Sequence, residues 1–293
     1  MIKTWLIQIR ANFLALAVIL VMIGGAASYH EGIFDIIRFL LTMVGIVLAH
    51  ISVNLFNEYS DWRSGIDDMT DRTPFSGGTG TLQEGKLPPG QVRFASWLTL
   101  IIAFFIGCYL AWVSGWPVLA FMAIGGLSTV FYTDYLTKWM LGEVTSGIAL
   151  GSLVVIGAYY VQTVTVSPSI VWASVPPGLL TMELLFLNEF PDVDADRHGG
   201  RLNMVIALGK KRAAIGYAVI IAAVYVSLAL SVLTGNAPWT LLIGLLTLPL
   251  AIMAVYRAIR YPDNRERFMP ALGMNVIVVL ATDALMALGY VLG

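Results

Sequence analysis

Nine long apolar runs divide this chain of 293 residues, and they limit its fold more than any other feature. A run of roughly 20 apolar residues is long enough to cross a lipid bilayer as a helix. Hydrophobic residues make up 58% of the sequence and charged residues only 12%, which is far from the composition of a soluble domain. The predicted membrane helices are 11–28, 35–57, 94–114, 117–135, 144–165, 169–190, 212–234, 238–257 and 268–292.

The runs leave no polar stretch long enough to form a second core. We therefore expect one all-α integral membrane domain over residues 1–293, with about nine helices around a central cavity. Pro176 and Pro177 lie inside the sixth run, where they should kink the helix or interrupt its backbone hydrogen bonds.

The basic residues predict the orientation of this multi-pass protein. If the N-terminus is cytoplasmic, all 17 lysines and arginines except Arg38 fall on the cytoplasmic side. Such an excess follows the positive-inside rule. Three connections on the opposite side, around 114–116, 166–168 and 234–236, are short and uncharged, so the long loops should form a cap on the cytoplasmic face.

Two further features exclude classes of function. The net charge is −1, which does not favour a nucleic-acid partner. Cys108 is the only cysteine, so neither an intrachain disulfide nor a metal cluster of thiolates can form.

One short pattern, Asn-Glu-aromatic-x-Asp, occurs twice, at 57–61 and at 188–192, each time at the end of an apolar run. Ionisable residues at such places are costly and are functional candidates. Helical spacing extends each pattern into a polar stripe along one face. The two stripes are His50, Asn54, Asn57 and Asp61, and Thr181, Asn188, Asp192 and Asp196.

These stripes suit a divalent cation. Asn and Asp four positions apart lie roughly 6 Å apart along a helix axis, close enough to share one ion or adjoining ions. Oxygen ligands with few His or Cys nearby favour Mg²⁺, or Mn²⁺, over zinc. Because Mg²⁺ commonly completes its shell with substrate phosphates, a diphosphate substrate follows. Helix capping would explain a lone Asp at a helix end, but it does not explain the repetition.

At these motifs the chain resembles the UbiA superfamily of intramembrane prenyltransferases, and most of all its menaquinone-biosynthesis branch. The first family motif, Asn-x3-Asp-x3-Asp, is matched by Asn57 and Asp61, but Gly65 stands in third place and Asp67 follows. That longer spacing is similar to the menaquinone branch. The second motif is complete. A third similar stretch is 131–138, followed by Leu-Gly-Glu at 141–143, whereas the basic run usual after the second motif reads Gly-Arg-Leu-Asn at 200–203.

The resemblance implies a Mg²⁺-dependent enzyme that transfers an isoprenyl or polyprenyl group from its diphosphate to an aromatic acceptor. It implies that the metal ligands, which bridge the diphosphate, are Asn57, Asp61, Asp67, Asn188, Asp192 and Asp196. Lys138 joins the four aspartates as a catalytic candidate. The other substrate-binding candidates are Asn54, Arg63, Arg72, Tyr132, Arg197 and Arg201.

Several alternatives stay open at this point. The basic candidates could serve only as topology charges, and Tyr132 could be an interfacial anchor. An ion-coupled transporter also uses intramembrane acids, although near the bilayer midplane, and a noncatalytic scaffold is a third class. The resemblance favours 1,4-dihydroxy-2-naphthoate as acceptor, but other quinone precursors, haem or a lipid glycerol phosphate also fit. The sequence specifies neither the tail length nor the oligomeric state.

Overall fold

The computed structural model describes residues 1–70 and 72–293 and places most of them in helices. The helices are α1 (Ile2–Gln8), α2 (Leu14–His30), α3 (Ile36–Ser64), α4 (Pro89–Ser114), α5 (Pro117–Phe131), α6 (Gly142–Thr145), α7 (Leu153–Thr163), α8 (Pro168–Asn188), α9 (Val193–His198), α10 (Met204–Leu208), α11 (Lys210–Leu233), α12 (Leu248–Arg260) and α13 (Arg265–Leu292). Over these described ranges there is no β-strand, which confirms the predicted all-α class.

Eight of the described helical segments, some of them formed by consecutive elements, are long and apolar enough to cross a membrane. The predicted span that is not among these eight is the fourth, 117–135, which corresponds to α5; this helix has 15 residues and ends at Phe131 rather than at residue 135. The count of nine therefore stays a prediction.

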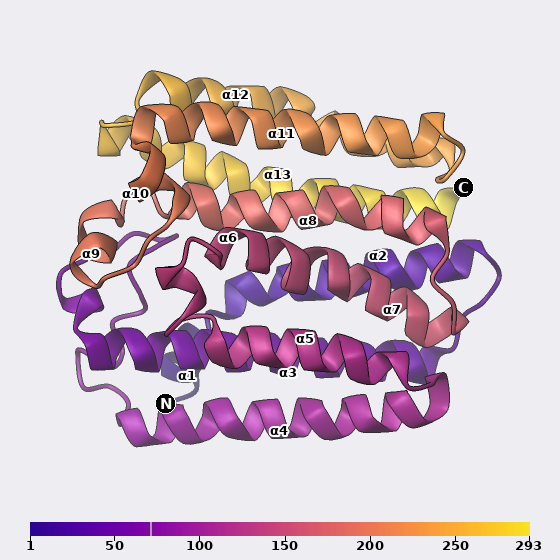
Figure 1. Cartoon of the computed structure of the whole chain (residues 1–293), viewed down its shortest axis with the longest axis horizontal. Coiled ribbons are helices and arrows are strands. Elements are labelled where there is room, and N and C mark those ends of the chain that lie inside the picture. Colours follow the sequence, from indigo (N-terminus) through magenta and orange to yellow (C-terminus); the bar gives the residue numbers. More distant parts are fainter. Residues whose placement is uncertain (71) are drawn as a thin grey trace.

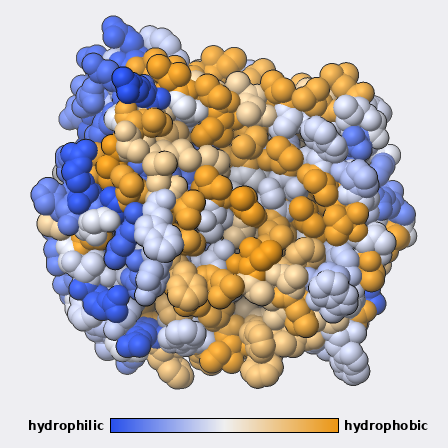
Figure 2. Space-filling model, in the orientation of Figure 1, coloured by the Kyte–Doolittle hydropathy of each residue, from blue (hydrophilic) through white to orange (hydrophobic). Residues whose placement is uncertain are grey.

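The long helices lie side by side along the longest axis of the molecule, with α4 at one edge and α11 and α12 at the other (Figure 1). The short helices α9 and α10 lie together at one end of this bundle, beside the end of α3 (Figure 1). We call it the motif end, because Asp61 and Asn188 lie near the helix termini there. Figure 2 shows hydrophilic side chains gathered at this end and a hydrophobic belt over the middle of the bundle.

The first motif lies inside a helix, which corrects the expected end of the second span at residue 57. Helix α3 continues to Ser64 and stops at Gly65, whose φ of 76° is the left-handed conformation that glycine adopts without a steric penalty. A 3₁₀ turn, η2 (Ile66–Asp68), follows directly. Asn57 and Asp61 are therefore held on a rigid helix.

Helix α8 extends from Pro168 to Asn188 with Pro176 and Pro177 inside it, so the two prolines do not end the helix, and the expected kink stays a prediction. The irregular backbone belongs to the neighbouring segment η4 (Ser146–Ser152), which is a π-helix between α6 and α7. A Cβ added to Gly151 would lie 2.7 Å from the Cα of Gly178, so these two glycines allow the backbones to meet. Ser152 Oγ also donates a 2.9 Å hydrogen bond to the carbonyl of Ser174.

The main apolar core holds α2, α7, α8, α11 and α13 together. Its fully buried side chains include Leu20, Tyr159, Phe186, Tyr217 and Leu228. The space between α3, α4, α5 and α7 is filled less completely, and this is where a cavity opens.

Candidate active site

A cavity of about 630 Å³ enters the bundle from the motif end. Its walls come from α3, α4, α5, α7 and α8, and part of the segment after α3 covers it through Ser76, Gly77 and Gly78. On α3 the lining extends from Asp61 to Thr42, which is roughly 28 Å along a helix at 1.5 Å per residue. The polar groups gather at the motif end, and the deep walls are mostly apolar.

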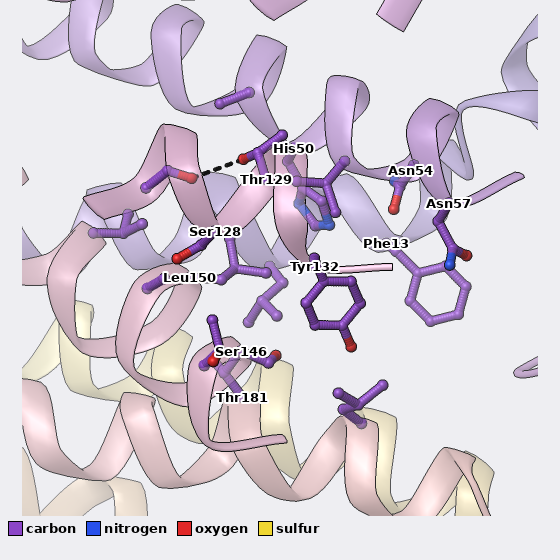
Figure 3. Close-up of a pocket in the computed structure, with 18 of the residues that line it drawn as sticks. Phe13, His50, Asn54, Asn57, Ser128, Thr129, Tyr132, Ser146, Leu150 and Thr181 are labelled. Carbon is purple, nitrogen blue, oxygen red and sulfur yellow. Dashed lines mark hydrogen bonds between the residues drawn. The ribbon is translucent and has the colours of Figure 1, made fainter. Parts of the chain in front are cut away.

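Helix α3 turns its whole predicted stripe toward this cavity, since His50, Asn54, Asn57 and Asp61 all line it. Figure 3 shows His50, Asn54 and Asn57 on this wall, with Tyr132 between them and Ser146 and Thr181. Asn54 Nδ2 donates a 2.9 Å hydrogen bond to the carbonyl of Ile9, which fixes the side chain. Asn57 Nδ2 lies 3.4 Å from Thr133 Oγ1.

Asp67 reaches the same cavity although it lies beyond the end of the helix. The left-handed residue Gly65 turns the chain, and the 3₁₀ turn then buries Asp67 to 4% exposure. Its Oδ2 accepts a 3.1 Å hydrogen bond from Gln83 Nε2. The longer spacing of the first motif thus has a structural cause, because a helix that stops at Gly65 presents its next acid through the turn.

The second motif spans the junction between α8 and α9. Asn188 ends α8, Asp192 precedes α9, and Asp196 is buried within α9. All three line the cavity, together with Thr181. The structure therefore brings both predicted stripes to one space.

Arg201 lies between the two motifs. Its Nη2 forms an ion pair with Asp61 Oδ1, and its Nη1 donates a 3.1 Å hydrogen bond to Asp196 Oδ1. Asn203 Nδ2 donates a 3.0 Å hydrogen bond to the other oxygen of Asp196. The basic stretch that departs from the family pattern thus supplies a direct contact to both acidic motifs.

Burial raises the pKa of four acids at the motif end. The pKa of Asp192 rises to about 7 because the carboxyl is buried and Asp196 lies nearby. The pKa of Asp67 is raised by burial and by Glu58, and that of Glu189 by burial and by Glu143. For Asp196 burial raises the pKa, while Arg201 acts in the opposite direction. A cation that paired with these carboxyls would favour their ionised forms.

The donor set fits a divalent metal. Asn188 Oδ1, Asp192 Oδ1 and Glu189 Oε2 are buried oxygens without a hydrogen-bond partner. Buried oxygens of this kind normally need a donor or an ion. Within residues 1–70 and 72–293, no three acidic, His or Cys side chains stand close enough to hold an ion as they are. That Asn57, Asp61, Asp67, Asn188, Asp192 and Asp196 would hold Mg²⁺ therefore stays a prediction.

Sequence reasoning missed Arg10, which it placed only among the topology charges. The guanidinium of Arg10 lines the cavity and forms a 2.6 Å ion pair with Glu58. Glu58 also accepts hydrogen bonds from the backbone N–H and the hydroxyl of Thr79. The position of Glu58 inside the first motif was the only sign of this ion pair in the sequence, because Arg10 lies before the first predicted span.

Four of the predicted basic residues lie outside the cavity lining. Arg63 is exposed and pairs with Asp134 at 3.3 Å, and Arg72 pairs with Glu84 at 3.0 Å. Lys138 and Arg197 are also exposed. Their proposed contacts with substrate stay predictions, and Arg201 is the predicted basic residue that the structure brings between the motifs.

Tyr132 lines the cavity and stands near Glu189 and Arg201. Burial, followed by Glu189, raises the pKa of its hydroxyl, so the phenol stays neutral. Glu143 was quoted in the sequence only as part of a similar stretch. It is buried to 1% exposure and accepts a 2.6 Å hydrogen bond from the backbone N–H of Met204.

Known proteins are similar to this chain in sequence and in fold. The model of the UbiA prenyltransferase family matches residues 17–277. The 1,4-dihydroxy-2-naphthoate octaprenyltransferase of Escherichia coli is 27% identical over 300 residues, which cover 99% of this chain and 96% of that protein.

Two solved structures share the fold. The apo UbiA homologue from Aeropyrum pernix has a TM-score of 0.75 and 18% identity, and the match covers 96% of this chain and 98% of that one. A homologue from Archaeoglobus fulgidus, solved with GPP and Mg²⁺, has a TM-score of 0.60 and 12% identity, covering 97% and 99%. Since the family match covers most of the chain, this membrane protein belongs to the UbiA prenyltransferase family.

Proposed function

We propose that this enzyme transfers a polyprenyl group from its diphosphate to a ring carbon of 1,4-dihydroxy-2-naphthoate or a similar quinone precursor, in a Mg²⁺-dependent reaction. The allylic C–O bond breaks and diphosphate leaves, a C–C bond to the ring forms, and the naphthoate ring loses its carboxyl group as CO₂. A precursor without that carboxyl group would lose a proton instead. The observation that supports this proposal is one cavity that joins two acidic motifs to a long apolar space. Such a space suits an amphipathic substrate with a charged head and an apolar tail.

The acidic motifs would hold the head of the substrate. Mg²⁺, when bound, neutralises charge on the leaving diphosphate. In this proposal Asn57, Asp61 and Asp67 bind from α3 and its following turn, and Asn188, Asp192 and Asp196 bind from the second motif. Arg201 lines the same space, and Asn54 would orient the head through its fixed amide. Arg63, Arg72, Lys138 and Arg197 are proposed as further diphosphate contacts.

The tail and the reacting carbon would lie deeper. Apolar walls exclude the water that would otherwise capture an allylic cation. Tyr132 stands at the boundary between the polar end and the apolar walls (Figure 3). Its neutral ring could stabilise positive charge on the allylic carbon through its face.

We also propose that the motif end faces the cytoplasm. Support comes from the basic residues, which are concentrated in the segments at that end. Soluble diphosphate would then be released on the cytoplasmic side, while the prenylated product enters the bilayer.

Turnover in nanodiscs tests this function. The purified protein is given a labelled prenyl diphosphate and a panel of aromatic acceptors, with Mg²⁺ or with EDTA. We expect a Mg²⁺-dependent prenylated naphthoate, and no transfer by Asp61→Ala or Asp192→Ala, each still inserted in the membrane. Ion flux without transfer would overturn the proposal in favour of the transporter alternative.

A further inference from the structure

Arg201 occupies the position where the two acidic motifs meet. It pairs with Asp61 from α3 and with Asp196 from α9, and its side chain is only 16% exposed. Both carboxylates are proposed metal ligands, so the guanidinium of Arg201 pairs with two carboxylates that a divalent ion would also bind. The positive charge of Arg201 explains why two carboxylates can lie beside it in a buried place.

The backbone around Arg201 is well anchored. Its own N–H donates a 2.9 Å hydrogen bond to the carbonyl of Asp196, and the N–H of Leu202 donates one of 2.9 Å to the carbonyl of Thr137. Asn203 caps α10 by accepting from Ile206 N at 2.8 Å. A change of partner at Arg201 therefore needs only side-chain rotation.

Other oxygens of the site lack any such partner. Asn188 Oδ1 and Asp192 Oδ1 are buried and make no hydrogen bond. They line the same cavity as the two acids that Arg201 contacts. The site thus combines free ligand oxygens with two carboxylates held by a cation of the protein.

We propose that Arg201 is a resident counter-cation of the metal-free enzyme. A divalent ion displaces its guanidinium from Asp61 and Asp196, and the freed guanidinium then binds the diphosphate that arrives with the metal. Arginine suits both partners, because its planar fork matches carboxylate and phosphate oxygens alike. This inference rests on the proposed function, since it concerns the same metal and diphosphate.

The inference predicts that Arg201→Gln strengthens the binding of a divalent metal and weakens the binding of prenyl diphosphate. Mn²⁺ alone is titrated into the protein in nanodiscs, and free Mn²⁺ is followed by EPR. Without the competing guanidinium, we expect the Kd for Mn²⁺ to fall by about tenfold, on the scale of one charged hydrogen bond. The KM for prenyl diphosphate should rise at saturating metal.

Thermal unfolding gives a second readout that does not depend on turnover. In EDTA, Arg201→Gln leaves Asp61 and Asp196 without their counter-cation, so its Tm should lie below that of the wild type. Saturating Mg²⁺ should raise the Tm of the variant more than that of the wild type. Arg212→Gln is the matched control, because Arg212 is exposed at the start of α11 and outside the cavity.

Arg201→Lys covers the case in which the Gln variant does not fold. Lysine keeps the charge but lacks the fork that spans two carboxylates. We expect a Kd for Mn²⁺ between those of the wild type and Arg201→Gln.

Two results would overturn the inference. An unchanged Kd for Mn²⁺ in Arg201→Gln and Arg201→Lys would mean that the guanidinium does not compete with metal. Weaker Mn²⁺ binding, with a Tm that Mg²⁺ fails to restore, would mean that Arg201 stays on the acids as a fixed support. Neither outcome depends on the acceptor, so a failure of naphthoate prenylation in the wild type would be recognised separately.

Discussion

Thr79 Oγ1 donates a 2.6 Å hydrogen bond to Glu58 Oε2 and thereby ties the segment after α3 to the first motif. We call residues 72–87 the cap segment. The backbone N–H of Thr79 donates to the same carboxylate at 3.1 Å, and Arg10 pairs with it from the N-terminal side. One buried glutamate therefore joins three parts of the chain beside the cavity.

This junction predicts that Thr79→Val loosens the cap segment. The variant loses a hydrogen bond to a charged group, a contact worth about 1.5–3 kcal/mol. We expect faster proteolysis within 72–87 and a higher KM for prenyl diphosphate, because Ser76, Gly77 and Gly78 then cover the cavity less often. Limited proteolysis and steady-state kinetics measure the two effects.

Thr99→Val is the matched control. Thr99 lies in α4, and its hydroxyl donates to two carbonyls of its own helix, those of Ala95 at 2.9 Å and Ser96 at 3.1 Å. If both variants show the same proteolysis rate and the same KM, the Glu58 junction does not hold the cap segment.

The first motif gives a second prediction. Asp67 is 4% exposed and lines the cavity, whereas Asp68 is exposed to solvent. Asp67→Asn should therefore weaken Mg²⁺-dependent turnover far more than Asp68→Asn. Activity titrated with Mg²⁺ compares the two variants, and an equal loss would place the last ligand of this motif elsewhere.

Much of this architecture could be predicted from periodicity. Hydrophobic runs located the long helices, and a step of three or four residues correctly placed His50, Asn54, Asn57 and Asp61 on one wall. The end of α3 could not be located in the same way, because its last turns are polar and look like a loop. Gly65 was the available signal, as a glycine that ends a helix.

Contacts between distant segments were beyond the reach of the sequence. Arg201 and Asp61 are 140 residues apart, and Arg10 and Glu58 are 48 apart, so no local pattern relates them. Arg63 and Lys138 stand beside motifs and were therefore predicted as ligands, and that role stays a prediction. Position along the chain does not say which way a side chain points, and both side chains lie outside the cavity lining.

The third prediction concerns pH. The pKa of Asp192 is raised to about 7 by burial and by Asp196, so the metal-free carboxyl binds a proton near neutral pH. A metal ligand must be ionised. We expect Mn²⁺ binding to weaken as the pH falls from about 8 to about 6, with proton release at neutral pH. Calorimetry in buffers of different ionisation enthalpy measures that release.

The same shift has a consequence for stability. A raised pKa means that the folded state binds a proton more tightly than the unfolded chain does, where Asp titrates at about 3.9. The metal-free enzyme should therefore lose stability as the pH rises from about 4 through about 7, and Mg²⁺ should restore it above that range. A Tm in EDTA that rises over this window would contradict the assignment.

The last prediction concerns the tail of the substrate. Gly126 lines the cavity from α5, and a Cβ built there would meet no atom within 4 Å. Gly126→Leu should fill part of this space without disturbing the helix. We expect the KM for long prenyl diphosphates to rise severalfold while short ones are used as before, measured with a series of chain lengths. Gly90→Leu is the control, because Gly90 also has open space around it but lies outside the cavity lining. If Gly126→Leu raises the KM equally for every chain length, the tail does not pass α5 at this position.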